Sequence, residues 1–253
     1  RLRILLVEDN AINQMLACRL LERWGHHVVV AADGTLALLA LDREPFDLVL
    51  MDLQMPEMGG LEATAAIRRR ERGAGPRLPI VALTAHAMSG DRDRCLAAGM
   101  DGYLSKPIDP QELFVTIQTL FPGPAVSPPQ LVPAAPPVAP ALQPDQLLRR
   151  LGGSVELLGE LCRLYQTERP KLSARLRDAL VAGDAQAVYR AAHSLKGVLG
   201  NLAATGAAER ALELETAGRG GDLARAETLY PELEASLQQL ERELVELHKE
   251  TAT

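Results

Sequence analysis

The sequence predicts two domains of different classes, an α/β domain with a parallel sheet and an all-α helical bundle. The chain has 253 residues, which is long enough for two separate hydrophobic cores. Its first half alternates short apolar runs with amphipathic stretches, whereas its second half shows only helical periodicity, from about Gln146 to Lys249. A proline-rich segment separates the halves, so we predict domains at 1–121 and 145–253 with a linker at 122–144.

The first domain is predicted to contain five strands, each followed by a helix. The expected strands are Arg3–Val7, Val28–Ala31, Leu48–Asp52, Ile80–Thr84 and Gly102–Ser105. The expected helices are Ala11–Trp24, Thr35–Asp42, Gly60–Arg70, Ser89–Ala98 and Gln111–Phe121. This alternation is typical of a doubly wound parallel sheet with helices on both faces.

The linker is predicted from its prolines. Nine of them fall between Phe121 and Pro144, and they leave no room for a helix or a central strand. Such a segment favours polyproline II, which rises about 3.1 Å per residue and forms a semi-rigid spacer.

The second domain is predicted to be an antiparallel helical bundle. Four interruptions of the helical pattern are expected to separate its helices: Pro170, Gly183–Asp184, Gly206 and Gly218–Asp222. Pro231 lies inside the last helical stretch and is expected to kink or split it.

The composition excludes several classes of function. The formal net charge of −6 argues against contact with nucleic acid or anionic membranes, and the short basic run Arg68–Arg72 is interpreted as the solvated end of a helix. No apolar run approaches the roughly 20 residues that span a bilayer, and Cys18, Cys95 and Cys162 lack the spacing of a metal site. We therefore expect a cytoplasmic segment. Because the chain starts at Arg1 rather than Met, a longer parent protein anchored in an inner membrane remains open.

Polar residues follow four of the five predicted strands. Glu8 and Asp9 follow the first strand, Asp52 ends the third, Thr84 ends the fourth and Lys106 follows the fifth. Taken singly, such an acid is often a helix N-cap and such a threonine reflects only strand propensity. The carboxyl ends of parallel strands share one edge, however, so we expect these side chains to converge where such folds bind ligands.

These residue types predict phosphoryl-transfer chemistry. Clustered carboxylates repel one another unless a cation joins them, and oxygen ligands suit Mg²⁺. A carboxylate beside Mg²⁺ can attack a phosphoryl group, which identifies Asp52 as a candidate nucleophile. Lys106 and the hydroxyl of Thr84 would then hold the oxygens of the transferring group.

Four stretches of this domain, "ILLVEDNAINQ", "DLVLMDLQMPEMGGLEA", "VALTAHA" and "GYLSKP", together resemble a response-regulator receiver domain over about Arg1–Phe121. The resemblance implies a flavodoxin-like sheet of five strands, with Asp52 as the phosphoacceptor. It implies a Mg²⁺ site whose ligands are Glu8, Asp9, Asp52 and the backbone carbonyl of Gln54. It also implies that Thr84 and Tyr103 form the switch pair, that Lys106 senses the phosphate, and that the Lys106–Pro107 bond is cis. Many relatives carry two aspartates where this chain has Glu8 and Asp9, so we expect the longer Glu8 to reach the metal through water.

The second domain contains an unusual helical stripe in "AAHSLKGVLG". With Asp184 as the N-cap, His193 lies about 200° from Leu195 on the helical wheel and is expected to point away from the core. His193, Lys196, Gly197 and Gly200 occupy i, i+3, i+4 and i+7 of one face. For His193 alone, an ordinary surface residue is the simpler interpretation. Two glycines on its face, each costing about 0.5–1 kcal/mol relative to alanine, favour a functional one.

The longer stretch "AAHSLKGVLGNLAATGAAERALELE" resembles a histidine-containing phosphotransfer (HPt) domain. The resemblance implies a four-helix bundle with an extra N-terminal helix, on which His193 is the phosphohistidine. We expect Lys196 to neutralise the phosphoryl group, and Gly197 and Gly200 to provide docking space for a partner's active site.

Together the two domains predict a segment of a bacterial-type two-component phosphorelay. Phosphoryl would pass from a kinase phosphohistidine to Asp52, then to His193, then to a downstream response regulator. The kinase domain would lie upstream, in the same protein or in another one. Because the chain has no glycine-rich nucleotide loop, we expect no ATP-dependent kinase within it, and its parent to be a hybrid sensor histidine kinase. A free-standing receiver–HPt adaptor is the alternative.

Two other classes of function stay open at this stage. A Mg²⁺-dependent aspartyl-phosphate hydrolase would also use a strand-end aspartate, but such enzymes usually carry a second aspartate two residues later, where this chain has Gln54. A scaffolding pseudo-receiver would be expected to have lost an acid or the lysine, and neither is missing here.

Overall fold

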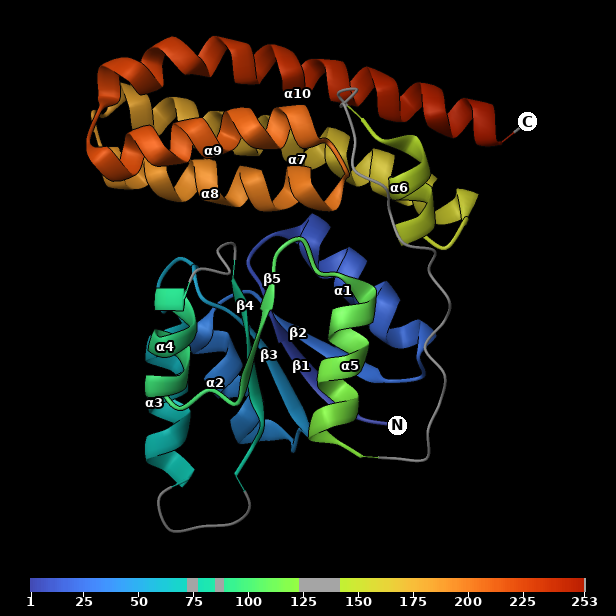
Figure 1. Cartoon of the computed structure of the whole chain (residues 1–253), viewed down its shortest axis with the longest axis vertical. Coiled ribbons are helices and arrows are strands. Elements are labelled where there is room, and N and C mark those ends of the chain that lie inside the picture. The colour runs from blue at the N-terminus through green and yellow to red at the C-terminus, as the bar shows by residue number, and fades with distance from the viewer. Residues whose placement is uncertain (72–76, 85–88, 123–141, 253) are drawn as a thin grey trace. The chain divides into compact units, whose positions relative to one another are not determined.

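The structure is a computed structural model of the chain and describes residues 1–71, 77–84, 89–122 and 142–252 (Figure 1). The side chains of residues 85–92 are not described. The chain divides into two compact units, Arg1–Gln130 and Leu131–Thr253. Most of the predicted linker, residues 123–141, lies outside the described residues.

The first unit is a five-stranded parallel sheet with helices on both faces, so the predicted fold class is confirmed (Figure 1). The strand order is β2-β1-β3-β4-β5. The strands are β1 (Arg3–Val7), β2 (His27–Ala31), β3 (Leu48–Asp52), β4 (Ile80–Thr84) and β5 (Gly102–Ser105). The helices are α1 (Ala11–Arg23), α2 (Gly34–Arg43), α3 (Gly60–Glu71), α4 (Ser89–Ala97) and α5 (Pro110–Leu120).

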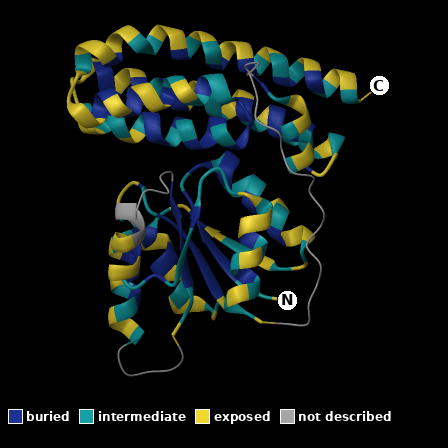
Figure 2. Cartoon of the chain, in the orientation of Figure 1, coloured by how far each residue is buried: buried dark blue, intermediate teal, exposed yellow. Residues whose placement is uncertain are grey.

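The strands form where they do because both faces of the sheet are covered. Every residue of β3 and β4 is buried, as Figure 2 shows by the dark blue centre of the sheet. Successive side chains point to opposite faces, so β1 contributes to two cores. Leu5 and Val7 pack with residues of α2 and α3, whereas Ile4 and Leu6 pack with residues of α1 and α5. Continuous apolar runs are what a parallel sheet buried on both faces requires.

The first turn of α1 is fixed directly behind β1. Asn10 is the N-cap, and its side-chain oxygen accepts hydrogen bonds from the backbone N–H groups of Ile12 (2.9 Å) and Asn13 (3.3 Å). These bonds satisfy donors that a helix start otherwise leaves unpaired. Glu8 and Asp9 are therefore held between a buried strand and a capped helix.

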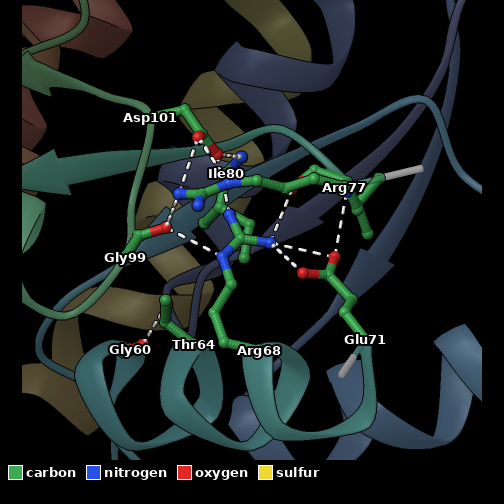
Figure 3. A network of polar contacts seen from close by, with 9 residues as sticks. Gly60, Thr64, Arg68, Glu71, Arg77, Ile80, Gly99 and Asp101 are labelled. Atoms are coloured by element: carbon green, nitrogen blue, oxygen red, sulfur yellow. Dashed lines mark hydrogen bonds and ion pairs between the residues drawn. The ribbon is translucent and has the colours of Figure 1, made fainter. Parts of the chain in front are cut away.

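The amino ends of β4 and β5 are tied together by Arg68 of α3 (Figure 3). Its guanidinium lies 2.7 Å from Asp101 and 2.8 Å from Glu71, and its Nε donates to the carbonyl of Gly99 at 2.8 Å. Asp101 in turn accepts from the backbone N–H of Ile80 at 2.9 Å. The expectation of a solvated basic helix end is therefore wrong for Arg68, because five fixed donors let one guanidinium satisfy several acceptors at once.

The second unit consists of helices, as predicted. They are α6 (Pro144–Arg150), α7 (Val155–Val181), α8 (Ala185–Asn201), α9 (Thr205–Gly220) and α10 (Leu223–Thr251). Among the described residues, no helix has both the length and the apolarity needed to cross a bilayer.

The predicted interruption at Pro170 is wrong, because α7 continues through it. Helix α10 likewise continues through Pro231, so that proline does not split the helix, and the expected kink stays a prediction. A proline inside a helix costs about 3 kcal/mol or more. Buried side chains on both sides of each proline offset that cost. In α7, Tyr165 precedes Pro170 and Leu172 follows it, and the Tyr165 hydroxyl donates to the carbonyl of Leu237 on α10 at 3.2 Å.

The structure also shortens the predicted linker at its carboxyl end. Pro144 is the first residue of α6 rather than the last of the linker, and Leu142 is already buried. The backbone N–H of Gln143 donates to the carbonyl of Ala203 at 3.0 Å, and Arg150 donates to carbonyls at the end of α8. Helix α6 is therefore attached to the turn that joins α8 and α9.

Replacing Arg68 with Lys should destabilise the first unit by about 1.5–3 kcal/mol, because one ammonium cannot bind Glu71, Asp101 and the Gly99 carbonyl together. The measurement is urea unfolding of the full chain, followed by the fluorescence of its single tryptophan, Trp24, which lies in this unit.

The matched control is Arg69→Lys, because Arg69 is an exposed neighbour of Arg68 and its replacement should change the free energy of unfolding by less than about 0.5 kcal/mol. Equal unfolding midpoints for the two variants would contradict the proposed tie.

Candidate functional site

The polar residues predicted to converge do lie at one edge of the sheet. Asp52 is the last residue of β3, Thr84 is the last of β4, and Glu8 and Lys106 directly follow β1 and β5. These four strands are neighbours in the sheet. One carboxylate oxygen from each of Glu8, Asp9 and Asp52 lies within 4.8 Å of the other two. Three acids this close form a site with the oxygen donors that a hard divalent cation prefers.

Lys106 joins two of these acids. Its Nζ lies 2.6 Å from Oε2 of Glu8 and 2.6 Å from Oδ2 of Asp52, and all three side chains are almost fully buried. A buried charge is tolerated only when it is paired. Burial alone would lower the pKa of Lys106, but the charges of Asp52 and Glu8 and their hydrogen bonds raise it, so the ammonium stays charged.

The carboxyl of Asp52 has a raised pKa. This pKa is raised to about 7, chiefly by burial and further by the charges of Glu8 and Asp9, although Lys106 acts in the opposite direction. Like charge from neighbouring acids disfavours ionisation of Asp52, so a cation bound among these acids would favour the ionised carboxylate.

The loop after β3 fits closely around Asp52. The backbone N–H of Gln54 donates to Oδ1 of Asp52 at 3.2 Å. A Cβ atom at Gly60 would lie 2.2 Å from the carbonyl oxygen of Asp52, so only glycine allows the chain to return this closely. The Lys106–Pro107 peptide bond is cis, as the sequence predicts.

The predicted switch pair occupies neighbouring strands. Thr84 is buried, and its carbonyl accepts from the backbone N–H of Lys106 at 2.6 Å. Tyr103 of β5 is partly buried and packs against the core between the sheet and helices α2 and α3. The "VALTAHA" motif continues into residues 85–87, which lie outside the described residues.

In the second unit, His193 does not point away from the bundle. Only 7% of its surface is exposed, because helix α9 packs against this side of α8. Its Nδ1 lies 2.8 Å from Oε1 of Glu215 on α9. The expectation of an outward histidine is therefore wrong. The helical wheel identified one apolar face, whereas α8 is buried on two.

Glu215 links the charged groups around His193. It is fully buried, and its Oε2 lies 2.5 Å from Nζ of Lys196, while Arg219 lies 3.4 Å from its Oε1. Burial raises the pKa of the Glu215 carboxyl, but hydrogen bonds and charge from His193 and Lys196 outweigh it and hold the pKa at about 2.

An ionised Glu215 determines which nitrogen of His193 carries the proton. A carboxylate only accepts hydrogen bonds, so the Nδ1 beside it must be the protonated nitrogen of the neutral imidazole. This tautomer is assigned from the hydrogen bond. It leaves the lone pair on Nε2, the nitrogen on the far side of the ring, as the nucleophilic position.

Glu215 was not among the residues predicted from the sequence, although its position on α9 carries a signal. Ala207, Ala211 and Leu214 mark the apolar stripe of α9, and all three are buried. Glu215 lies four residues after Ala211 and therefore on the same stripe. An acid on a core-facing stripe needs a buried partner, and the nearest candidates on α8 were His193 and Lys196.

A close approach of α8 and α9 brings Glu215 within reach. A Cβ atom at Gly218 would lie 2.6 Å from the backbone N of Tyr189 and 3.0 Å from the carbonyl oxygen of Ala185. Only glycine allows the two backbones to meet there, one turn from the Glu215–His193 hydrogen bond. Tyr189 flanks the site, with its ring centroid 6.1 Å from that of His193.

The two glycines of the predicted docking stripe lie on α8, but neither is fully open. Gly197 is buried and Gly200 is partly buried. The carbonyl of Gly200 accepts a hydrogen bond from Arg150 of α6. Their role in docking stays a prediction.

Replacing Gly218 with Ala should push α8 and α9 apart and cost about 1–3 kcal/mol of bundle stability, because backbone atoms cannot give way as a side chain can. The measurement is urea unfolding of the full chain followed by helical circular dichroism. Gly220→Ala is the control, since nothing lies within 4 Å of a Cβ atom there. Equal stability of the two variants would show that the close approach is not needed.

Replacing Glu215 with Gln should destabilise the bundle by about 1.5–3 kcal/mol at pH 7, because Lys196 loses its buried counter-ion. The carboxyl pKa is about 2 in the fold against 4.5 as its ordinary value, so its stabilising effect is complete above pH 4.5 and is lost as the pH falls toward 2.

The difference in unfolding free energy between wild type and Glu215→Gln should therefore shrink between pH 5 and pH 2, as measured by urea unfolding at each pH. Glu213→Gln, at an exposed position of the same helix, should show no such trend. A pH-independent difference for Glu215→Gln would exclude an ionised Glu215 as the cause.

Comparisons with known proteins agree with this geometry. The family model of the response regulator receiver domain matches residues 4–118, and that of the Hpt domain matches residues 160–243. Sensor histidine kinase GacS of Pseudomonas protegens is 37% identical over 201 residues, a match that covers 77% of this chain and 22% of that protein. Signal transduction histidine-protein kinase BarA of Escherichia coli K12 is 30% identical over 201 residues, covering 78% of this chain and 22% of BarA.

This chain thus spans 22% of the length of these two relatives. Among solved structures, the receiver domain of sensor histidine kinase PA1611 from Pseudomonas aeruginosa PAO1 is 43% identical, with a TM-score of 0.44. That match covers 48% of this chain and 98% of the PA1611 domain.

Proposed function

The chain belongs to the two-component phosphorelay proteins, as a response regulator receiver domain followed by an Hpt domain, and we propose that phosphoryl passes through it from Asp52 to His193. The observation that carries the proposal is that one chain contains two buried sites of complementary chemistry, one in each unit. In one, Asp52 lies beside Lys106 at an acidic edge, and in the other, the Nδ1 of His193 is bound to Glu215.

In the first step, the carboxylate of Asp52 is the nucleophile. One of its oxygens attacks the phosphorus of a kinase phosphohistidine, and the phosphorus–nitrogen bond breaks as the histidine leaves. Lys106 is close enough to Asp52 to bind an oxygen of the arriving phosphoryl group, and the hydroxyl of Thr84 is its proposed second donor. Thr84 and Tyr103 are then the proposed switch pair that responds to the new charge.

We further propose that Mg²⁺ binds at the acidic edge through Glu8, Asp9, Asp52 and the backbone carbonyl of Gln54. The residues fit a hard cation because an oxygen from each of the three carboxylates lies within 4.8 Å of the other two, and oxygen is the donor that Mg²⁺ prefers. When bound, Mg²⁺ supplies the positive charge that lets these acids ionise together and neutralises the phosphoryl oxygens.

In the second step, Nε2 of His193 attacks the phosphorus of the aspartyl phosphate. A phosphorus–nitrogen bond forms, the bond between phosphorus and the Asp52 oxygen breaks, and Asp52 leaves as a carboxylate. The ring then carries positive charge, which Glu215 stabilises through the Nδ1 hydrogen bond. Lys196, bound to the other oxygen of Glu215, is the proposed cation for the phosphoryl group on His193.

The proposed partners are a histidine-kinase domain upstream, in the same protein or in another, and a downstream response regulator that receives phosphoryl from His193. We propose that the parent is a hybrid sensor histidine kinase, because GacS and BarA are similar to this chain over a fifth of their lengths. All three cysteines are free, which supports a reducing compartment such as the cytoplasm.

The proposal is tested by phosphorylating the full chain with acetyl phosphate and Mg²⁺ and separating acid-labile phosphohistidine from acyl phosphate. Wild type should form both species, His193→Gln only the acyl phosphate, and Asp52→Asn neither. Glu215→Gln should label Asp52 normally but transfer about fivefold more slowly, because a neutral amide is a weaker partner for a charged ring by about 1 kcal/mol.

Two results would contradict the relay. Label that stops at Asp52 in the wild type would mean that phosphoryl is not transferred from Asp52 to His193 of this chain. Label on His193 in Asp52→Asn would mean that the histidine is charged without the aspartate.

A further inference from the structure

The Glu8 side chain is bound on both of its carboxylate oxygens. Its carboxylate is 2% exposed, and its two oxygens are bound from different elements. Oε1 accepts from Nδ2 of Asn13 at 2.8 Å and from the backbone N–H of Asn10 at 3.3 Å, both at the start of α1. Oε2 lies 2.6 Å from Nζ of Lys106. The carboxylate is thus shared between a helix and a lysine.

Of these partners of the Glu8 carboxylate, Lys106 should respond to phosphorylation of Asp52, whereas Asn13 should not. Lys106 also binds Asp52, and a phosphoryl group on Asp52 would attract the ammonium away from Glu8. Asn13 carries no charge, so the phosphoryl group does not attract it as it attracts the ammonium of Lys106. An amide donor also leaves the full negative charge on the carboxylate, whereas a lysine competes with any cation that binds there.

Asn13 is itself well anchored. Its side chain is buried, and its backbone N–H is bound by the N-cap Asn10. The next residue, Gln14, donates through Nε2 to the carbonyl oxygen of Glu8 at 2.6 Å. The first turn of α1 therefore holds Glu8 by its main chain through Gln14 and by its carboxylate through Asn13.

We propose that Asn13 is a positioning residue that keeps the Glu8 carboxylate in place for the metal ion while Lys106 turns to the phosphoryl group. A glutamate has one more rotatable bond than an aspartate, so it loses more conformational entropy when its rotamer is fixed. Because Asn13 already holds the Glu8 carboxylate, the side chain loses less entropy when the cation binds. This inference rests on the proposed Mg²⁺ site.

The test is the Mg²⁺ dissociation constant of the full chain, measured by titration calorimetry without any phosphoryl donor. Asn13→Ala should weaken binding about tenfold, the lower range for loss of a residue that orients a ligand. Asn13→Ser, which is too short to reach the carboxylate, should do the same. Gln14→Ala is the matched control and should change the constant by less than about threefold, because Gln14 binds only the main chain of Glu8 in this contact.

A double-mutant cycle separates positioning from general damage to the fold. In a Glu8→Asp background the shorter acid should not reach Asn13, so Asn13→Ala should have no further effect on Mg²⁺ affinity. Labelling of Asp52 by acetyl phosphate should need about tenfold more Mg²⁺ in Asn13→Ala but reach the wild-type rate at saturation.

Three outcomes would overturn the inference. Wild-type affinity in Asn13→Ala or Asn13→Ser would remove Asn13 from the site. A tenfold loss that persists in the Glu8→Asp background would show that Asn13 acts on the fold and not on Glu8. Absence of Mg²⁺ binding by the wild type would instead refute the proposed metal site itself, and this inference with it.

Discussion

A buried carboxylate shared with a lysine is the interaction on which both candidate sites depend. Asp52 and Glu8 share Lys106 at the edge of the sheet, and Glu215 binds Lys196 and His193 within the bundle. An unpaired charge in such places would cost several kcal/mol, roughly the whole stability margin of a small domain. The surrounding fold therefore has to bring acid and base together, and this requirement explains features far from the reacting atoms.

The pairing of a buried carboxylate with a lysine has a different effect in each of the two sites. At the sheet edge, acids outnumber the lysine, so burial and like charge raise the pKa of Asp52 and favour binding of a second cation. In the bundle, the cations outnumber the acid, so Glu215 stays ionised and directs the proton of His193 to Nδ1. The first site brings acids together to hold a cation, and the second brings cations together around one acid, which suits phosphoryl moving from the first to the second.

Much of this was predictable from the sequence, because parallel strands buried on both faces read as continuous apolar runs and their ends determine where polar residues meet. The strands agree with the structure to within one residue, and Asp52, Thr84 and Lys106 converge as expected. The inward His193 and its bond to Glu215 were not predicted, because one helical wheel cannot show how closely a second helix packs. The predicted helix break at Pro170 was wrong for a related reason, because tertiary packing of α7 outweighed the low helix propensity of proline.

The most direct test of the account is the protonation state of the His193 ring in the full chain, read from its two nitrogen chemical shifts by NMR at a pH where the imidazole is neutral. We predict a protonated Nδ1 and an unprotonated Nε2 in the wild type, with a mixture of tautomers appearing in Glu215→Ala. A proton on Nε2 in the wild type would contradict the account, because the lone pair would then face Glu215 and no nucleophile would be left for phosphoryl transfer.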